Sequence, residues 1–89
     1  MSDKTDMVTV YSTPWCAFCK TEKQWLDSLG VQYLSKDIEE DESAKEELLA
    51  KLDGQFQGVP TTEIAGQMIV GFDRPKLEEA LRNNQLLAN

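Results

Sequence analysis

The stretch "MVTVYSTPWCAFCK", residues 7–20, decides the fold. Its first part, residues 7–12, is apolar and β-branched, which predicts a strand. Pro14 then breaks the strand, because it fixes its own φ and pushes the preceding residue towards extended geometry. From Cys16 onward the pattern is helical. Two cysteines, Cys16 and Cys19, therefore lie where a strand passes into a helix. They could bind a metal, form a structural disulfide or react with a substrate.

The residues that follow predict an α/β domain. The helix that begins at Cys16 is expected to end at Gly30, and a second strand is expected over 31–38. Strand, helix and strand in this order form a βαβ unit with parallel strands and a right-handed crossover. The remaining elements expected are a helix over 41–52, a loop over 54–58, two strands about a turn at 65–66, and a helix over 76–87 with Pro75 in its first turn. The predicted order is β-α-β-α-β-β-α.

Length and charge limit the functions that the chain can have. Its 89 residues predict a single domain, with residues 1–6 as a flexible tail. The formal charge is −7, from 16 acids and 9 bases without a basic stripe, so we expect no nucleic-acid partner and no binding to anionic membranes. No apolar run approaches the ~18 residues of a membrane span. The N-terminus lacks the pattern of a secretory signal, which favours a cytoplasmic protein.

The spacing of the cysteines favours a chemically reactive pair. A structural zinc site needs four Cys or His ligands, whereas this chain has two cysteines and no histidine, so we expect no metal held by one chain. A disulfide between Cys16 and Cys19 would close a very short loop and constrain the unfolded chain little, which argues against a purely structural disulfide. Two alternatives stay open: an iron–sulfur cluster bridging two chains, and a pair of unreactive buried cysteines.

The position of each cysteine predicts its role in thiol–disulfide exchange. Free backbone N–H groups at a helix N-terminus favour a thiolate, and Cys16 is placed there. Cys19 is one helical turn deeper, so we expect Cys16 to attack a disulfide and Cys19 to resolve the mixed disulfide. Lys20 and Lys23 either support the anion as nearby cations or are solvated surface.

Three neighbours of the pair are further candidates. Trp15 is expected to be exposed and to form an apolar lip with Phe18, although Phe18 suits the core equally well. Glu22 interrupts the apolar stripe of the helix, which consists of Phe18, Trp25, Leu26 and Leu29. A buried carboxylate there could accept the proton of Cys19. The orientation that we favour for Glu22 is towards solvent, beside a lysine.

The stretch "GVPTT", residues 58–62, supplies the second half of the predicted site. Proline at the start of a strand is found at an edge or in a cis bond. We expect a cis bond between Val59 and Pro60, which would turn the peptide groups of Val59 outward. An extended partner peptide could pair with them as an added strand beside Cys16.

Together, "VTVYSTPWCAFC" and "GVPTTEIAGQMIVGFD" resemble the glutaredoxin branch of the thioredoxin-like proteins, including the NrdH-redoxins, small electron donors to ribonucleotide reductase. The resemblance implies a four-stranded mixed sheet with helices on both faces, the first two strands parallel and the last two antiparallel. It also implies Cys16 as nucleophile, Cys19 as resolving thiol and Pro60 as the cis proline. The implied activity is a dithiol oxidoreductase that reduces protein disulfides or mixed disulfides.

The resemblance leaves the electron donor open. Thr13 stands where many glutaredoxins have a lysine, and Phe72 replaces a small residue, whereas Val59, Gly71 and Asp73 keep the backbone cradle for a thiol. "GFDRP" resembles the Gly-Phe-Arg-Pro of NrdH-redoxins with one residue inserted, and the WCxFC pattern is similar to mycoredoxins. The electron donor that the resemblance implies is glutathione, another low-molecular-weight thiol or a thioredoxin-reductase-like protein. We expect the protein to be a monomer and to hold no bound cofactor. The alternative function is iron–sulfur cluster binding or transfer through Cys16 in a bridged dimer.

Overall fold

The computed structural model describes residues 8–56, 58–84 and 86. Its elements are, in order, β1 (Val8–Ser12), α1 (Ala17–Ser28), β2 (Leu34–Asp37), α2 (Glu42–Lys51), β3 (Thr61–Ile64), β4 (Gln67–Val70) and α3 (Arg74–Asn83). The predicted order of helices and strands is confirmed. The tail expected over residues 1–6 lies outside the described residues.

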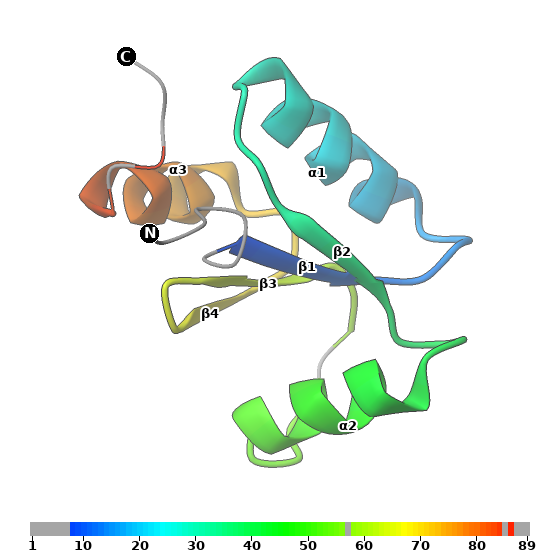
Figure 1. Cartoon of the computed structure of the whole chain (residues 1–89). Coiled ribbons are helices and arrows are strands. Elements are labelled where there is room, and N and C mark those ends of the chain that lie inside the picture. The colour runs from blue at the N-terminus through cyan, green and yellow to red at the C-terminus, as the bar shows by residue number, and fades with distance from the viewer. Residues whose placement is uncertain (1–7, 57, 85, 87–89) are drawn as a thin grey trace.

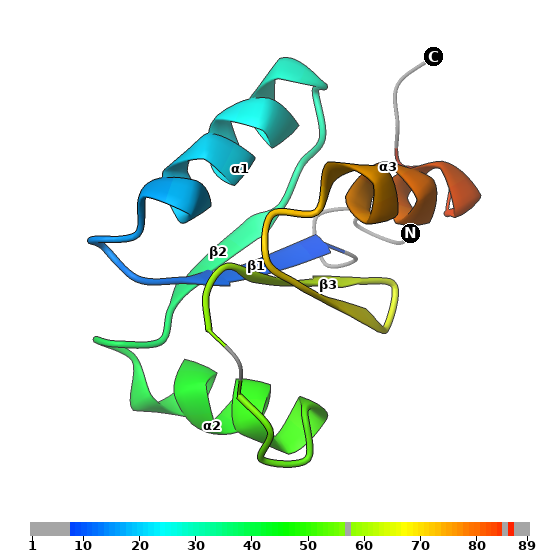
Figure 2. The ribbon, with the colours of Figure 1, turned by 180° about the vertical axis from the view of Figure 1, so that it is seen from behind.

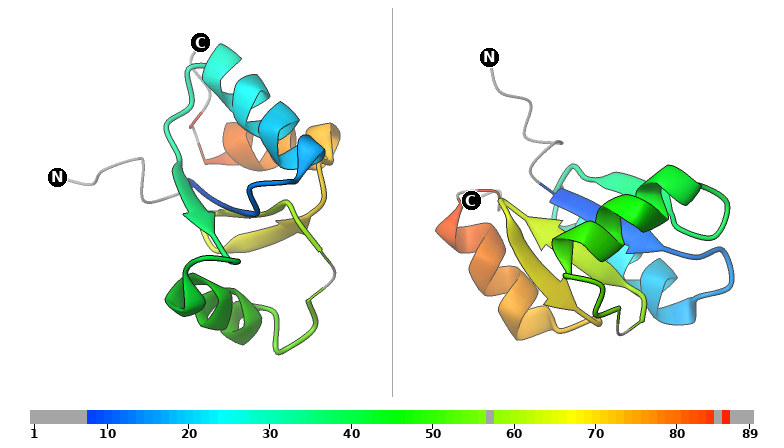
Figure 3. Two further views of the ribbon diagram at one scale, coloured as in Figure 1. Left: turned by 90° about the vertical axis from the view of Figure 1, so that its right-hand side faces the viewer. Right: turned by 90° about the horizontal axis from the view of Figure 1, so that it is seen from below.

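The four strands form one mixed sheet in the order β2-β1-β3-β4. β1 runs parallel to β2 and antiparallel to β3, and β3 runs antiparallel to β4. Helices α1 and α3 cover one face of the sheet and α2 covers the other, as Figure 1 and the reverse view in Figure 2 show. The side view in Figure 3 separates these three layers. The α/β architecture that the resemblance implied, a four-stranded mixed sheet with helices on both faces, is confirmed.

β1 is buried on both faces because it is an inner strand with a helix layer on each side. Val8 and Val10 belong to the core shared with α1 and α3, which includes Leu26, Ile64, Leu77 and Leu81. Tyr11 points the other way, into a smaller core with Ile38, Ala44 and Leu48. The alternation of side chains along a strand explains why one short segment contributes to both cores.

Gly30 ends α1 as expected and thereby shortens the strand that follows. Its φ of 72° is left-handed, which glycine adopts without steric cost. The N–H of Gly30 donates to the carbonyl of Asp27 at 3.1 Å, and the N–H of Val31 donates to the carbonyl of Leu26 at 3.1 Å. These two bonds form a Schellman motif. Because Val31 takes part in the cap, the expectation of a strand over 31–38 is wrong at its start, and β2 begins at Leu34.

The closing helix is also shorter than expected. The predicted range 76–87 is wrong at both ends, since α3 begins at Arg74, with Asp73 as its N-cap, and ends at Asn83. Pro75 lies in the first turn, as predicted. The N–H of Leu86 donates to the carbonyl of Leu81 at 2.8 Å, so Leu86 folds back on the helix end and packs on the core from there.

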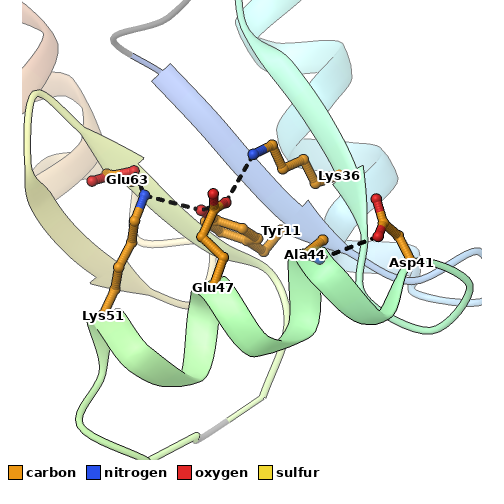
Figure 4. A network of polar contacts seen from close by, with 7 residues as sticks. All are labelled: Tyr11, Lys36, Asp41, Ala44, Glu47, Lys51 and Glu63. Carbon is orange, nitrogen blue, oxygen red and sulfur yellow. Dashed lines mark hydrogen bonds and ion pairs between the residues drawn. The ribbon is translucent and has the colours of Figure 1, made fainter.

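A polar network fastens α2 to three strands of the sheet (Figure 4). The Tyr11 hydroxyl donates to the Glu47 carboxylate at 2.7 Å, and Lys36 Nζ donates to the same oxygen at 2.8 Å. Lys51 Nζ donates to the Tyr11 hydroxyl at 3.2 Å and to Glu63 at 2.5 Å. Burial first, and the bond to Glu47 second, raise the pKa of Tyr11 to about 12, so the hydroxyl stays a donor at neutral pH. The network holds α2, which forms one wall of the candidate site.

Candidate active site

Cys16 is the N-cap of α1, at the point where β1 passes into the helix. Its backbone is extended, with φ −86° and ψ 112°, and its Sγ accepts a hydrogen bond from the N–H of Cys19 at 3.1 Å. The first turn of α1 carries no acidic side chain that would repel an anion. Free amides and the positive end of the helix dipole therefore face this sulfur, which is the arrangement that stabilises negative charge on an N-cap.

The two sulfurs lie in different surroundings. Cys16 is 7% exposed, whereas Cys19 is 1% exposed and lies beneath it in the helix. Burial, followed by the hydrogen bond to Cys16, raises the pKa of Cys19 above its usual value, so Cys19 is a protonated thiol at neutral pH. Of the two candidate cations, Lys23 donates to the Ser12 hydroxyl at 2.9 Å and Lys20 is exposed.

The Val59-Pro60 peptide lies beside the reactive sulfur. The bond is cis, as expected, and Pro60 is fully buried. The carbonyl oxygen of Val59 lies 3.8 Å from Cys16 Sγ, close enough for a thiol to donate to it. The loop that contains this peptide is anchored to the end of β4, because the carbonyl of Pro60 accepts the N–H of Gly71 at 2.7 Å. Residues about forty positions apart in the sequence thus meet at one sulfur.

A hollow of about 550 Å³ opens next to Cys16. Most of its lining is apolar, and the lining residues are Thr13, Trp15, Cys16, Ala17, Phe18, Ile38, Glu39, Lys45, Phe56, Gly58 and Val59. Trp15 is 69% exposed, as predicted. Phe18 is 67% exposed, so its place in the buried stripe of α1 was wrong: the buried residues of that helix are Cys19, Glu22 and Leu26. Thr13 is buried, and among the described residues its hydroxyl has no hydrogen-bond partner.

Several residues of this hollow were missed by the sequence analysis. Ile38 and Glu39 come from the turn after β2, Lys45 from α2, and Phe56 and Gly58 from the loop before β3. Trp15 Nε1 donates to the Glu39 carboxylate at 2.6 Å, which joins the turns after β1 and β2. The acidic run after β2 was the available signal, but it did not indicate which acid would face the cysteines.

Gly71, Phe72 and Asp73 do not line this hollow. They surround a second hollow of about 500 Å³ with Val70, Arg74 and Pro75. Phe72 packs on the core, with its ring edge-on to Trp25 at a centroid distance of 5.8 Å, and Asp73 caps α3. These residues therefore have structural contacts of their own, and the thiol-binding role expected for them stays a prediction.

The expected orientation of Glu22 is wrong. The side chain is fully buried against the sheet instead of pointing to solvent. Thr62 on β3 donates its hydroxyl to one carboxyl oxygen, and the other oxygen has no partner among the described residues. Burial raises the pKa of Glu22 to about 7, although the bond from Thr62 and the charge of Lys23 oppose the shift. Glu22 thus titrates near neutral pH inside the core.

Two negative findings apply to the described ranges. Within residues 8–56, 58–84 and 86, no group of three or more His, Cys, Asp or Glu side chains is arranged to hold a metal ion. Over the same part of the chain, no helix is long and apolar enough to cross a membrane.

A CxxC pair at a strand–helix junction, beside a cis proline and on a mixed sheet that has helices on both faces, is typical of a thioredoxin-like protein. The Glutaredoxin family model matches residues 8–69 of the chain. The chain therefore belongs to the glutaredoxin family. The type of activity that this family and fold support is thiol–disulfide oxidoreduction, and the chain has a Cys16–Cys19 pair.

Known proteins agree with this assignment. An uncharacterized glutaredoxin-like 8.6 kDa protein from the rubredoxin operon of Clostridium pasteurianum is 33% identical over 75 residues, which span 84% of this chain and 97% of the relative. A mutant of the thioredoxin-like protein BC3987 matches with a TM-score of 0.79 at 32% identity, over 85% of this chain and 95% of its own. A buckwheat glutaredoxin–glutathione complex matches with a TM-score of 0.69 at 26% identity, over 92% and 82%.

Proposed function

We propose that this protein is a dithiol oxidoreductase that reduces protein disulfides or mixed disulfides in the cytoplasm and acts as a monomer. One observation carries the proposal: Cys16 Sγ accepts an amide N–H at the start of α1, and the carbonyl of Val59 lies 3.8 Å away. The sulfur is thus held where an anion is stabilised, next to a backbone group that can align an extended peptide.

The reaction has two exchange steps. The Cys16 thiolate attacks one sulfur of the substrate disulfide, the substrate S–S bond breaks, and the released thiolate takes a proton. Cys19 then loses its proton and attacks Cys16 Sγ, which forms the Cys16–Cys19 disulfide and releases the second substrate thiol. The substrate has gained two electrons, and a donor dithiol or two donor thiols return them to the pair.

Glu22 is the proposed acceptor of the Cys19 proton. It lies one helical turn further along α1, and a pKa of about 7 lets it accept a proton at neutral pH. The hydrogen bond that it receives comes from Thr62. In the proposal, Glu22 takes the proton of Cys19 after the mixed disulfide on Cys16 has formed. The rate at which the second substrate thiol is released from that mixed disulfide therefore measures the role of Glu22.

The proposed electron donor is a thioredoxin-reductase-like protein. Thr13 supplies no cation beside Cys16, and the hollow that Cys16 lines is also lined by the acid Glu39 and the base Lys45. Glutathione carries a net negative charge, as does this chain, whose formal charge is −7. Like charges disfavour the encounter and the bound complex.

A comparison of donors tests the function and the donor together. NADPH consumption is measured with a protein disulfide and either thioredoxin reductase or glutathione with its reductase. We expect turnover with thioredoxin reductase to be faster by about tenfold or more, a difference of about 1.4 kcal/mol in transition-state binding. Faster turnover with glutathione contradicts the proposed donor, and no turnover with either contradicts the proposed function. Brown protein that loses its absorbance to chelators would support the bridging cluster instead.

A further inference from the structure

We propose that Glu39 is a specificity-determining residue, which with Trp15 selects protein disulfides that carry a basic side chain and a large apolar side chain close to the reactive cysteine. The inference rests on the proposed function and names the substrate class of the same site. It assigns the hollow beside Cys16 to an apolar side chain of the partner, and the rim of that hollow to a cationic one.

Glu39 is held in a fixed position at the rim. The carboxylate of Asp37 accepts the N–H of Glu39 at 2.8 Å and that of Glu40 at 3.2 Å, which shapes the turn after β2. The Glu39 side chain in turn accepts Trp15 Nε1 at 2.6 Å. A carboxylate and an indole ring therefore stand side by side, positioned by hydrogen bonds within the chain before any partner arrives.

This corner is suited to a cation. Among the ion pairs of the described residues, none involves Glu39, so its negative charge is not neutralised within that part of the chain. The side chain is exposed, as is the ring of Trp15, at 69%. A guanidinium or ammonium group attracts both a carboxylate and the face of an indole ring.

The surrounding charge has the same sign. Residues 39–47, "EEDESAKEE", hold six acids and one base. That base, Lys45, lines the hollow, and it is the feature that would favour an acidic partner. The acids Glu40, Asp41 and Glu42 are exposed around the same turn and helix start. Their summed field favours a basic segment and slows the approach of an acidic one.

The aromatic and aliphatic lining of the hollow suits an apolar side chain. Phe18 is 67% exposed and Phe56 is 43% exposed, and both line the hollow together with Ile38 and Val59. Exposed aromatic rings gathered in a concave site are typical of interaction surfaces. Because Cys16 lines the same hollow, an apolar residue seated there lies next to the disulfide under attack.

Matched peptides test the inference. Four cysteine peptides, each in mixed disulfide with mercaptoethanol, combine leucine or glycine on one side of the cysteine with arginine or aspartate on the other. The second-order rate constant of each with the reduced protein is measured at low and at high salt. We expect the leucine–arginine peptide to react about tenfold or more faster than the leucine–aspartate peptide at low salt, and the ratio to fall with salt.

Variants identify the residues responsible. Glu39→Gln retains an acceptor for Trp15 and is expected to lower the arginine-to-aspartate ratio, whereas Lys45→Gln is expected to raise it. Phe56→Ala is expected to remove the advantage of leucine over glycine. Glu79→Gln, an exposed acid on α3, is the matched control and should leave both ratios as in the wild type.

The failure of the inference is separable from the failure of the proposed function. Wild-type protein is first assayed with hydroxyethyl disulfide, which is small and neutral. Reduction of this compound combined with equal rates for the four peptides, or with a ratio that Glu39→Gln does not lower, overturns the inference alone. No reduction of hydroxyethyl disulfide by the wild type overturns the proposed function, and the inference with it.

Discussion

Replacing Glu22 by glutamine is expected to stabilise the folded protein above pH 7 by about 3 kcal/mol, since 1 pKa unit corresponds to about 1.4 kcal/mol. The pKa of Glu22 is raised from its ordinary value of 4.5 to about 7 by burial. Between these values the folded chain holds a proton that the unfolded chain has released. The contribution of Glu22 to stability is therefore retained below pH 4.5 and lost as the pH rises through 7. Glutamine has the shape of the protonated acid and cannot ionise, so it avoids this loss.

Urea unfolding of wild type and variant between pH 4 and pH 8.5 measures the effect. The stability difference should be small at pH 4 and grow up to about pH 7, and Glu79→Gln, which changes an exposed acid, should show no such trend. A difference that does not vary with pH would mean that Glu22 does not titrate in the core.

The same variant tests the catalytic proposal, because Glu22→Gln should slow release of the mixed disulfide without slowing its formation. An unchanged rate of release rejects Glu22 as the proton acceptor.

Replacing Cys16 by serine is expected to lower the reduction of a protein disulfide by at least about a thousandfold, because the nucleophile of the first step is lost. Cys19→Ser should behave differently, since Cys16 can still attack but nothing within the chain resolves the product. In the absence of other thiols, the Cys19→Ser protein should accumulate as a one-to-one mixed disulfide with the substrate, detectable by intact-protein mass spectrometry. Adduct on the Cys16→Ser protein instead would reverse the assigned roles.

Most of the fold was predictable because its signals are local. The β-branched run before Pro14, the cysteines at a strand–helix junction and the glycine at a helix end each act within a few residues. The C-terminal end of α2 at Asp53-Gly54 is a further case: the N–H of Gly54 donates to the carbonyl of Leu49 at 2.7 Å, as in a Schellman motif. The start of β2 was missed because Val31 was already used in the cap of α1.

The site was predictable only in part, because its remaining residues depend on tertiary contacts. The burial of Glu22 depends on Thr62, which is 40 positions away, and a helical pattern alone cannot reveal that partner. Glu39 and Phe56 reach the hollow because the turn after β2 and the loop before β3 converge on Cys16. Phe18 was assigned to the apolar stripe by spacing, whereas the neighbouring Cys19 is on the buried face.

The central claim is that the two sulfurs have different reactivity: Cys16, the N-cap of α1, is the attacking sulfur, and Cys19, more deeply buried beneath it, is the resolving one. The most direct test is alkylation of the reduced, folded protein at pH 7 with a limiting amount of iodoacetamide, followed by fragment-ion mass spectrometry to locate the label. We expect Cys16 to be labelled at least about ten times faster than Cys19, with Cys19 reacting only after unfolding in urea. Equal labelling of the two residues, or faster labelling of Cys19, would contradict the account.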